Sequence, residues 1–212
     1  ITSVEALSFN KKYYVKQYRK LGVAETIGVS DQDLMKATDQ LLDYIKGKVA
    51  DLDVKVEIDG DMVPMFNQRE IDHMVDVQVL MLKVLLIRNV LAVLSLLLIV
   101  FAIVSKDFKD LVLMRDSLVQ GLMILGVVLG FIGIYAIVDF DAFWIQFHEL
   151  LFTNDLWLLD PRTDRLIMMV PQAFFSGLVY RILTAIGLII SIALLSVYRL
   201  GKEIRYVAHR SI

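Results

Sequence analysis

A run of thirty-five residues without proline or glycine, residues 70–104, constrains the fold of this chain more than any other feature. At a rise of 1.5 Å per residue such a helix is roughly 50 Å long, whereas the hydrocarbon core of a bilayer is about 30 Å thick. Residues 89–104 carry no charged side chain, so they form the deepest part of a predicted membrane span. The helix is therefore expected to leave the membrane and continue into a water-facing head.

Two further segments, residues 117–138 and 173–198, are also long and apolar enough to cross a bilayer. Hydrophobic residues make up 57% of the chain and charged residues only 22%, which is typical of an integral membrane protein. The net charge of −2 gives no reason to expect a nucleic-acid partner. The absence of cysteine excludes a cysteine nucleophile, a disulfide framework and a thiolate metal site.

The spans divide the chain into seven predicted parts, which together make a mostly α, polytopic membrane protein with a small α+β head. Basic residues near the ends of spans favour the cytoplasm, which places the tail and the turn inside and the head and the lid outside. The parts are the head (1–77), the first span (78–104), a cytoplasmic turn (105–116), the second span (117–138), an interfacial lid (139–172), the third span (173–198) and a basic tail (199–212).

Local signals place three elements in the head. Residues 10–21 are predicted to form a helix because they contain no breaker and are followed by Gly22. Ser30 and Asp33 resemble a capping box, and a helical period follows them as far as Gly47. Alternating residues 54–58 followed by Asp and Gly at 59–60 predict a β-hairpin.

The lid is expected to hold two short helices at the membrane surface. The first is expected to begin after Asp139, which can cap it, and the second is expected to start at Asp160 and Pro161 and to reach Met169. On the first helix five large apolar residues share one face, a stripe suited to the membrane interface: Phe140, Phe143, Trp144, Phe147 and Leu151.

Two histidines on the predicted outer face are the candidates for proton transfer, because the reference pKa of imidazole is near neutral. His148 lies in the lid, and His73 lies at the head end of the first long helix. Asp76 follows His73 by three positions, so its carboxylate is expected to orient that imidazole or to stabilise its charged form. Arg181, a cation inside the third span, is a functional candidate because an intramembrane charge is costly.

The chain resembles the bacterial lipoprotein intramolecular transacylase family. The resemblance covers most of residues 30–199 and is carried by REIDHMVDV at 69–77, FHELLFTNDLWLLDPRTDRLI at 147–167 and PQAFF at 171–175. It implies four spans, so one more span is expected before residue 1. It also implies a multi-pass protein of the bacterial cell membrane, with His73 and His148 as catalytic residues on the extracytoplasmic side.

The implied reaction moves the sn-2 acyl chain of a lipoprotein's diacylglyceryl-cysteine to the α-amine of the same cysteine. Donor and acceptor belong to one molecule, so the enzyme needs only geometry and proton management. We expect His148 to act as the base and His73, with Asp76, as the acid or oxyanion partner, although the reverse assignment is nearly as favourable. Substrate contacts are expected from Trp144, Phe147, Asp155, Trp157 and Arg181.

We expect a monomer that works in membrane lipid on a diacylated lipoprotein, without cofactor or metal. Two other interpretations remain open at the level of the sequence. One is a zinc-dependent membrane hydrolase that binds the metal through His73, Asp76 and His148, although no HExxH motif supports it. The other is a non-enzymatic scaffold or transport component in which both histidines are structural.

Overall fold

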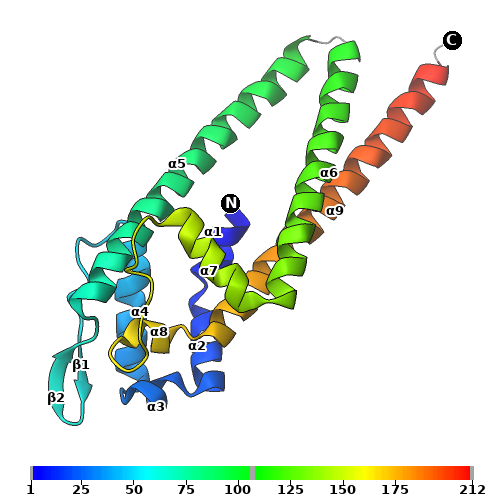
Figure 1. Ribbon diagram of the computed structural model, residues 1–212. Helices are drawn as coiled ribbons and strands as arrows, with labels where there is room; N and C mark the ends of the chain where they lie inside the picture. The colour runs from blue at the N-terminus through cyan, green and yellow to red at the C-terminus, as the bar shows by residue number, and fades with distance from the viewer. Residues whose placement is uncertain (1, 106–107, 211–212) are drawn as a thin grey trace. The chain divides into compact units, whose positions relative to one another are not determined.

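The computed structural model describes residues 2–105 and 108–210, which fall into two compact units (Figure 1). The first unit comprises Ile1–Asn89 and Asp141–Leu178, and the second comprises Val90–Phe140 and Val179–Ile212. The long helices α5 (Gln68–Ser105) and α9 (Gln172–Arg210) contribute residues to both units. The first unit holds both candidate histidines.

The head helices begin and end at the capping residues that the sequence predicts. Helix α2 (Lys11–Leu21) has Asn10 as its N-cap and Gly22, in the left-handed conformation, as its C-cap. Helix α4 (Asp31–Ile45) starts at Ser30, whose side chain accepts a hydrogen bond from the Asp33 amide. Helices α1 (Thr2–Ser8) and α3 (Val23–Ile27) are not predicted from the sequence.

The predicted hairpin is confirmed. Strands β1 (Lys55–Ile58) and β2 (Asp61–Pro64) pair antiparallel, with Ile58 opposite Asp61. Asp59 and Gly60 have φ angles of 52° and 87°, the two positive values that a type I′ turn requires. Proline ends the second strand because it has no amide proton to donate.

Aromatic residues of α2 pack the core of the first unit against the first turns of α9. Phe174 is fully buried and contacts the rings of Tyr13, Tyr14 and Tyr18 at centroid distances of 5.1, 4.9 and 5.9 Å. The Tyr13 hydroxyl donates to the Phe174 carbonyl oxygen at 2.9 Å. A Cβ at Gly177 would lie 2.9 Å from that hydroxyl oxygen, so a residue without a side chain lets the helices approach closely.

The lid differs from prediction in its second helix. Helix α7 (Phe140–Leu151) starts directly after Asp139, as predicted, whereas α8 (Arg165–Met169) starts five residues later than the predicted Asp160. The Asp160 carboxylate accepts the backbone N–H of Arg162 at 2.9 Å, and its carbonyl accepts that of Asp164 at 2.8 Å. These two hydrogen bonds form a turn at residues 160–164. The Asp160 carboxylate is used within this turn and does not cap a helix, so the helix begins only after the turn.

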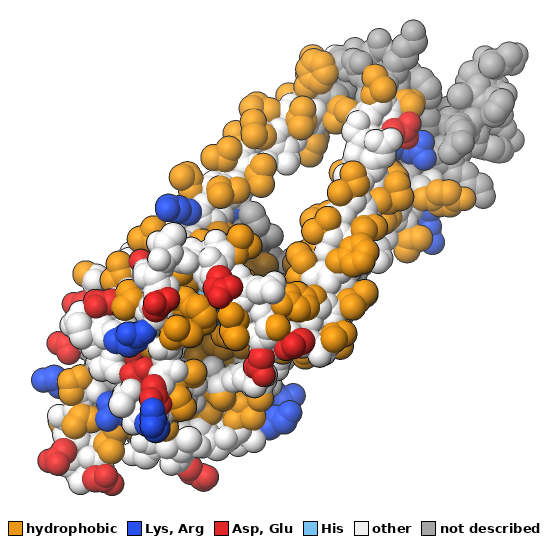
Figure 2. Space-filling view, in the orientation of Figure 1, with side chains coloured by type: hydrophobic (Ala, Val, Ile, Leu, Met, Phe, Trp, Pro, Cys, Tyr) orange, Lys and Arg blue, Asp and Glu red, His pale blue; other side chains and the backbone are white. Residues whose placement is uncertain are grey.

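Three helices are long and apolar enough to span a membrane among the residues that the structure describes: Gln68–Phe101, Val112–Val138 and Gln172–Arg199. The share of side chains buried within their apolar windows is at most 11%. Hydrophobic side chains cover the visible face of α6, whereas most charged side chains gather over the first unit (Figure 2). So much exposed apolar surface would be unfavourable in water and fits a lipid solvent.

Within the second unit, α6 (Phe108–Val138) packs against α9. Helix α6 begins inside the stretch 105–116 that the sequence predicts as a turn, and the helical backbone of α9 continues through the predicted tail as far as Arg210. A Cβ at Gly126 would lie 3.9 Å from Ile190, and one at Gly133 would lie 3.6 Å from Leu183, so two glycines of α6 face α9 side chains. The Tyr180 hydroxyl donates to the Ala136 carbonyl oxygen at 3.1 Å.

Candidate active site

His73 lies in the second turn of α5, near the N-terminal end, and this end of the helix is part of the head. Only 7% of its surface is exposed, and its Nδ1 atom is buried without a hydrogen-bond partner among the described residues. A buried polar atom of this kind usually has a partner, and leaving it unpaired costs free energy. The hydrogen-bonding capacity of this nitrogen is thus unused among the described residues.

His148 lies in the third turn of α7 and is equally buried, with 7% of its surface exposed. Its Nδ1 atom lies 2.7 Å from the carbonyl oxygen of Trp144. A carbonyl oxygen can only accept, so Nδ1 carries the proton and Nε2 of the neutral ring is left with a free lone pair. Burial lowers the pKa of His148, and the hydrogen bond to Trp144 opposes that shift in part.

The structure brings these two histidines together although they are far apart in the sequence. Their ring centroids are 6.2 Å apart and their planes are inclined by 38°. Phe152 contacts both rings, with centroid distances of 5.4 Å to His73 and 5.7 Å to His148. Sequence reasoning missed Phe152, which lies just beyond the end of α7 and outside its apolar stripe.

Three of the predicted substrate contacts surround His148. The Trp157 ring stacks on the imidazole at a centroid distance of 4.8 Å and an angle of 24°. Trp144 and Phe147 present themselves edge-on, at 4.6 and 5.3 Å. We call Trp144, Phe147, Phe152 and Trp157 the aromatic box. It fixes the orientation of the imidazole and gives it a poorly hydrated environment.

Asp76 does not make the orienting contact that the sequence suggests. Its carboxylate accepts a hydrogen bond from the side-chain amide of Asn154 at 2.8 Å, while Nδ1 of His73 has no partner. Asp76 therefore joins α5 to the lid without a hydrogen bond to His73, although its negative charge favours the charged form of that imidazole against the larger effect of burial, which favours the neutral form. The i, i+3 spacing allows the Asp76 carboxylate to contact the His73 ring, but the side-chain amide of Asn154 in the lid competes for this carboxylate.

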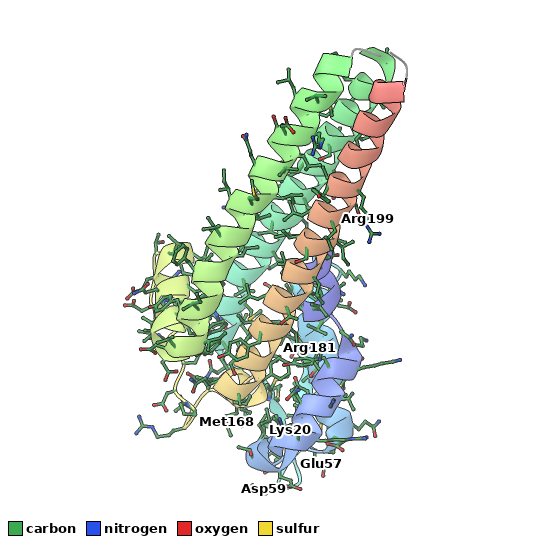
Figure 3. The ribbon with its side chains drawn as sticks, turned by 90° about the vertical axis from the view of Figure 1, so that its right-hand side faces the viewer. Lys20, Glu57, Asp59, Met168, Arg181 and Arg199 are labelled. Atoms are coloured by element: carbon green, nitrogen blue, oxygen red, sulfur yellow. The ribbon has the colours of Figure 1, made fainter. Side chains whose placement is uncertain are left out.

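The other two predicted substrate contacts lie differently. The backbone carbonyl of Asp155 accepts a hydrogen bond from the Arg69 guanidinium, and the residue itself is exposed. Arg181 is exposed on α9 in the second unit (labelled in Figure 3), and it stays a predicted contact.

A network that sequence reasoning missed ties the start of α5 to the start of α8. Asn67 and Glu70 form a reciprocal capping box, in which the Glu70 carboxylate accepts the Asn67 N–H at 2.7 Å and the Asn67 side chain accepts the Glu70 N–H at 3.0 Å. The second oxygen of Glu70 accepts the Leu166 N–H of α8, and Asn67 also donates to Asp164 at 2.7 Å. Only the capping box was visible in the sequence, as Asn followed three positions later by Glu.

We call Asn67, Glu70, Asp164 and Leu166 the α5–α8 latch. Glu70 is 1% exposed and lies one turn before His73. A buried carboxylate that accepts two backbone N–H groups fixes the relative position of the segments that supply them. The latch thus holds the end of the lid at a constant distance from the turn of α5 that carries His73.

Comparison with known proteins agrees with this architecture. The family model "Lipoprotein intramolecular transacylase Lit" matches residues 1–175. The chain belongs to the Lit family. Its members are integral membrane enzymes that modify lipoproteins. Comparison with curated proteins found no match.

Solved structures support the Lit fold. The in meso structure of the membrane integral lipoprotein intramolecular transacylase Lit from Bacillus cereus is similar with a TM-score of 0.75 and 22% identity, covering 97% of this chain and 89% of that one. Two further structures of Bacillus cereus Lit carry alanine or arginine in place of one histidine and have TM-scores of 0.74 and 0.73. Their identities to this chain are 19% and 20%.

Membership of the Lit family favours the transacylase over a scaffold or transport component. The zinc alternative required His73, Asp76 and His148 to share one ion. Over residues 2–105 and 108–210, no group of three His, Asp or Glu side chains is placed to hold a metal.

Proposed function

We propose that this Lit enzyme moves the sn-2 acyl chain of a diacylglyceryl-cysteine to the α-amine of the same cysteine. A nitrogen–carbon bond forms at the ester carbonyl, and the bond from that carbon to the glyceryl oxygen breaks. The amine loses a proton, and the glyceryl oxygen gains one. The reaction needs no external acyl donor, so its chemical demands are a base, a stabilised oxyanion and a dry site.

His148 is the proposed base. The observation that carries the proposal is its hydrogen bond to the Trp144 carbonyl, which leaves Nε2 of this buried ring free to accept a proton among the side chains of the aromatic box. Burial lowers the pKa of His148, so the ring stays neutral at a pH where an exposed histidine would already bind protons. The proton taken from the amine is then available to the departing glyceryl oxygen.

His73 is the proposed oxyanion partner. A buried imidazole is favoured in its neutral form, and a neutral ring still carries one N–H that can donate to a developing oxyanion. The amine nitrogen and the carbonyl oxygen of a tetrahedral intermediate are both attached to one carbon. Two rings with centroids 6.2 Å apart can each approach one of these atoms within about 3 Å.

The aromatic box and the latch are proposed to exclude water, which would otherwise compete with the amine for the ester. We propose that Trp144, Phe147 and Trp157 contact the acyl chain or the glyceryl group. Asp155 and Arg181 are proposed to bind polar parts of the substrate. The head and the lid are proposed to face the extracytoplasmic side of the membrane. Lipid ester groups lie between the hydrocarbon and the head groups, the layer in which an amphipathic lid is expected to lie.

A lipopeptide with isotope-labelled acyl chains tests the proposal. The purified protein would receive it in unlabelled phospholipid and again in detergent alone. The labelled chain should appear on the cysteine nitrogen of its own peptide in both cases, leaving a lysoglyceryl thioether. Transfer of unlabelled chains, or transfer between differently labelled peptides, would exclude an intramolecular reaction.

A further inference from the structure

Helix α2 carries a basic face that the proposed reaction does not use. The helix contains no Asp or Glu, and its five cationic side chains are all exposed: Lys11, Lys12, Lys16, Arg19 and Lys20 (Lys20 is labelled in Figure 3). Lys11 pairs with Asp39 of α4 at 2.7 Å. Among the described side chains no carboxylate forms an ion pair with Lys12, Lys16 or Arg19. We call these five cations the α2 basic face.

The opposite face of α2 places the helix at the end of a membrane span. Tyr13, Tyr14 and Tyr18 surround Phe174, which lies two residues inside α9. The candidate span of that helix is Gln172–Arg199, so Phe174 is close to the boundary between membrane and water. Helix α2 is therefore fixed beside the head-group end of a span.

An ion pair places the preceding helix at a similar depth. Arg88 of α5 pairs with Glu5 of α1, and it is the last charged residue before the uncharged stretch 89–104. A cation at this position marks the outer edge of the hydrocarbon. Between Glu5 and Lys11 the chain advances by three helical residues, at about 1.5 Å each, and by three further residues, at most about 3.6 Å each. Helix α2 therefore begins at most about 15 Å from the level of Arg88 in the membrane. The start of the basic face thus lies within reach of the head-group layer.

A shallow groove follows the α2 basic face. It is open to solvent and is lined by Lys11, Lys12, Val15, Lys16 and Arg19. Its cations suit a phosphate, and Val15 offers an apolar contact between them. Long lysine and arginine side chains can also extend along the membrane surface toward a head group.

We propose that the α2 basic face binds the phosphate of an anionic phospholipid in the leaflet that surrounds the head. The charges, the groove and the depth of α2 support this occupant together. The site lies on the outer face of α2, away from the tyrosines that pack the core, and it needs neither histidine. It would hold the head against the membrane surface, a role independent of acyl transfer.

The test compares lipid binding by the full chain and by the triple variant Lys12→Gln, Lys16→Gln, Arg19→Gln. Native mass spectrometry and thermal melting in detergent would be titrated with phosphatidylglycerol, phosphatidylcholine and inorganic phosphate. Basic residues near an anionic surface each strengthen binding about fivefold, so the triple variant should bind phosphatidylglycerol roughly 100-fold more weakly. That loss should shrink at high salt.

A matched variant, Lys36→Gln, Lys48→Gln, Lys55→Gln, removes three exposed charges elsewhere in the head and should bind phosphatidylglycerol like the wild type. Equal losses in both variants would show that only net charge matters and would overturn the proposal. The proposal would also be overturned if phosphatidylcholine or inorganic phosphate raised the melting temperature as much as phosphatidylglycerol does. A loss seen only with an acidic lipopeptide in phosphatidylcholine would overturn it as well, because that result would identify a peptide partner.

Discussion

Replacing Glu70 by alanine should loosen the attachment of α8 to α5 while the rest of the head stays folded. The carboxylate accepts the backbone N–H groups of Asn67 and Leu166 from inside the protein. Hydrogen bonds to a charged group contribute about 1.5–3 kcal/mol each, so the two together contribute about 3–6 kcal/mol. Part of this is offset because the variant no longer buries a carboxylate, and the expected net loss is about 2–4 kcal/mol.

Such a loss increases local opening by roughly thirtyfold to several hundredfold, because every 1.4 kcal/mol is a factor of ten. Hydrogen exchange measures this opening directly. In Glu70→Ala the backbone amides of α8 should exchange roughly thirtyfold to several hundredfold faster than in the wild type. The exchange rates of α4 and of the β-hairpin should not change. Product analysis should show more free fatty acid relative to N-acyl product, because water then reaches the ester.

Asp72→Asn is the matched control. Asp72 lies on the same helix two positions later, is exposed, and accepts a bond only from the side chain of Gln68 among the described residues. Its replacement should change stability by less than about 0.5 kcal/mol. If Glu70→Ala leaves the hydrogen exchange of α8 unchanged, Glu70 does not hold α8 against α5 and the prediction is refuted. It is equally refuted if protection falls by the same factor throughout the head, since Glu70 would then stabilise the whole unit.

The remaining predictions concern the histidines and their neighbours. His73→Ala and His148→Ala should each abolish the N-acyl product in folded protein, and the double variant should be scarcely worse than the worse single one; residual activity within a few-fold of wild type would make that histidine structural. Besides the limb of the substrate amine at about pH 7.7–8.0, kcat/KM should show an acidic limb below pH 6.5, because the base is lost only as pH falls through the lowered pKa of His148; an enzyme limb above 6.5 contradicts this assignment. Asp76→Asn should keep activity within about tenfold, since the carboxylate bonds Asn154 rather than His73; a loss of several hundredfold measured in kcat would restore its orienting role. Trp157→Leu removes the ring stacked on His148 as well as a proposed substrate contact, and it should lower kcat more than it raises KM; an effect on KM alone would show that Trp157 contacts the substrate but does not orient His148.

Local signals in the sequence predict the elements of this fold well where each signal is complete within a few residues. Asn10 and Gly22 bound α2, Ser30 and Asp33 start α4, and Asp59 and Gly60 form the hairpin turn. Capping and turn geometry depend on neighbouring backbone groups, so the chain specifies them without its tertiary structure. Helices α1 and α3 have only seven and five residues, too short to show a period, and long-range contacts stabilise them: the ion pair of Glu5 with Arg88 for α1, and the burial of Val23 and Ile27 for α3.

The site shows where local information ends. Sequence pattern identifies His73 and His148 as candidates because imidazole suits proton transfer, but periodicity on one helix says nothing about a partner on another. Only the folded chain sets the 6.2 Å separation of the rings, places Phe152 against both of them and stacks Trp157 on His148. The folded chain also places Asn154 so that it donates a hydrogen bond to Asp76, and it places the Leu166 N–H of α8 so that it donates to Glu70. The sequence by itself determined which residues can do the chemistry and which segments are apolar enough for the membrane. The tertiary structure decided which of those residues meet, because long-range contacts compete with local ones for the same side chains.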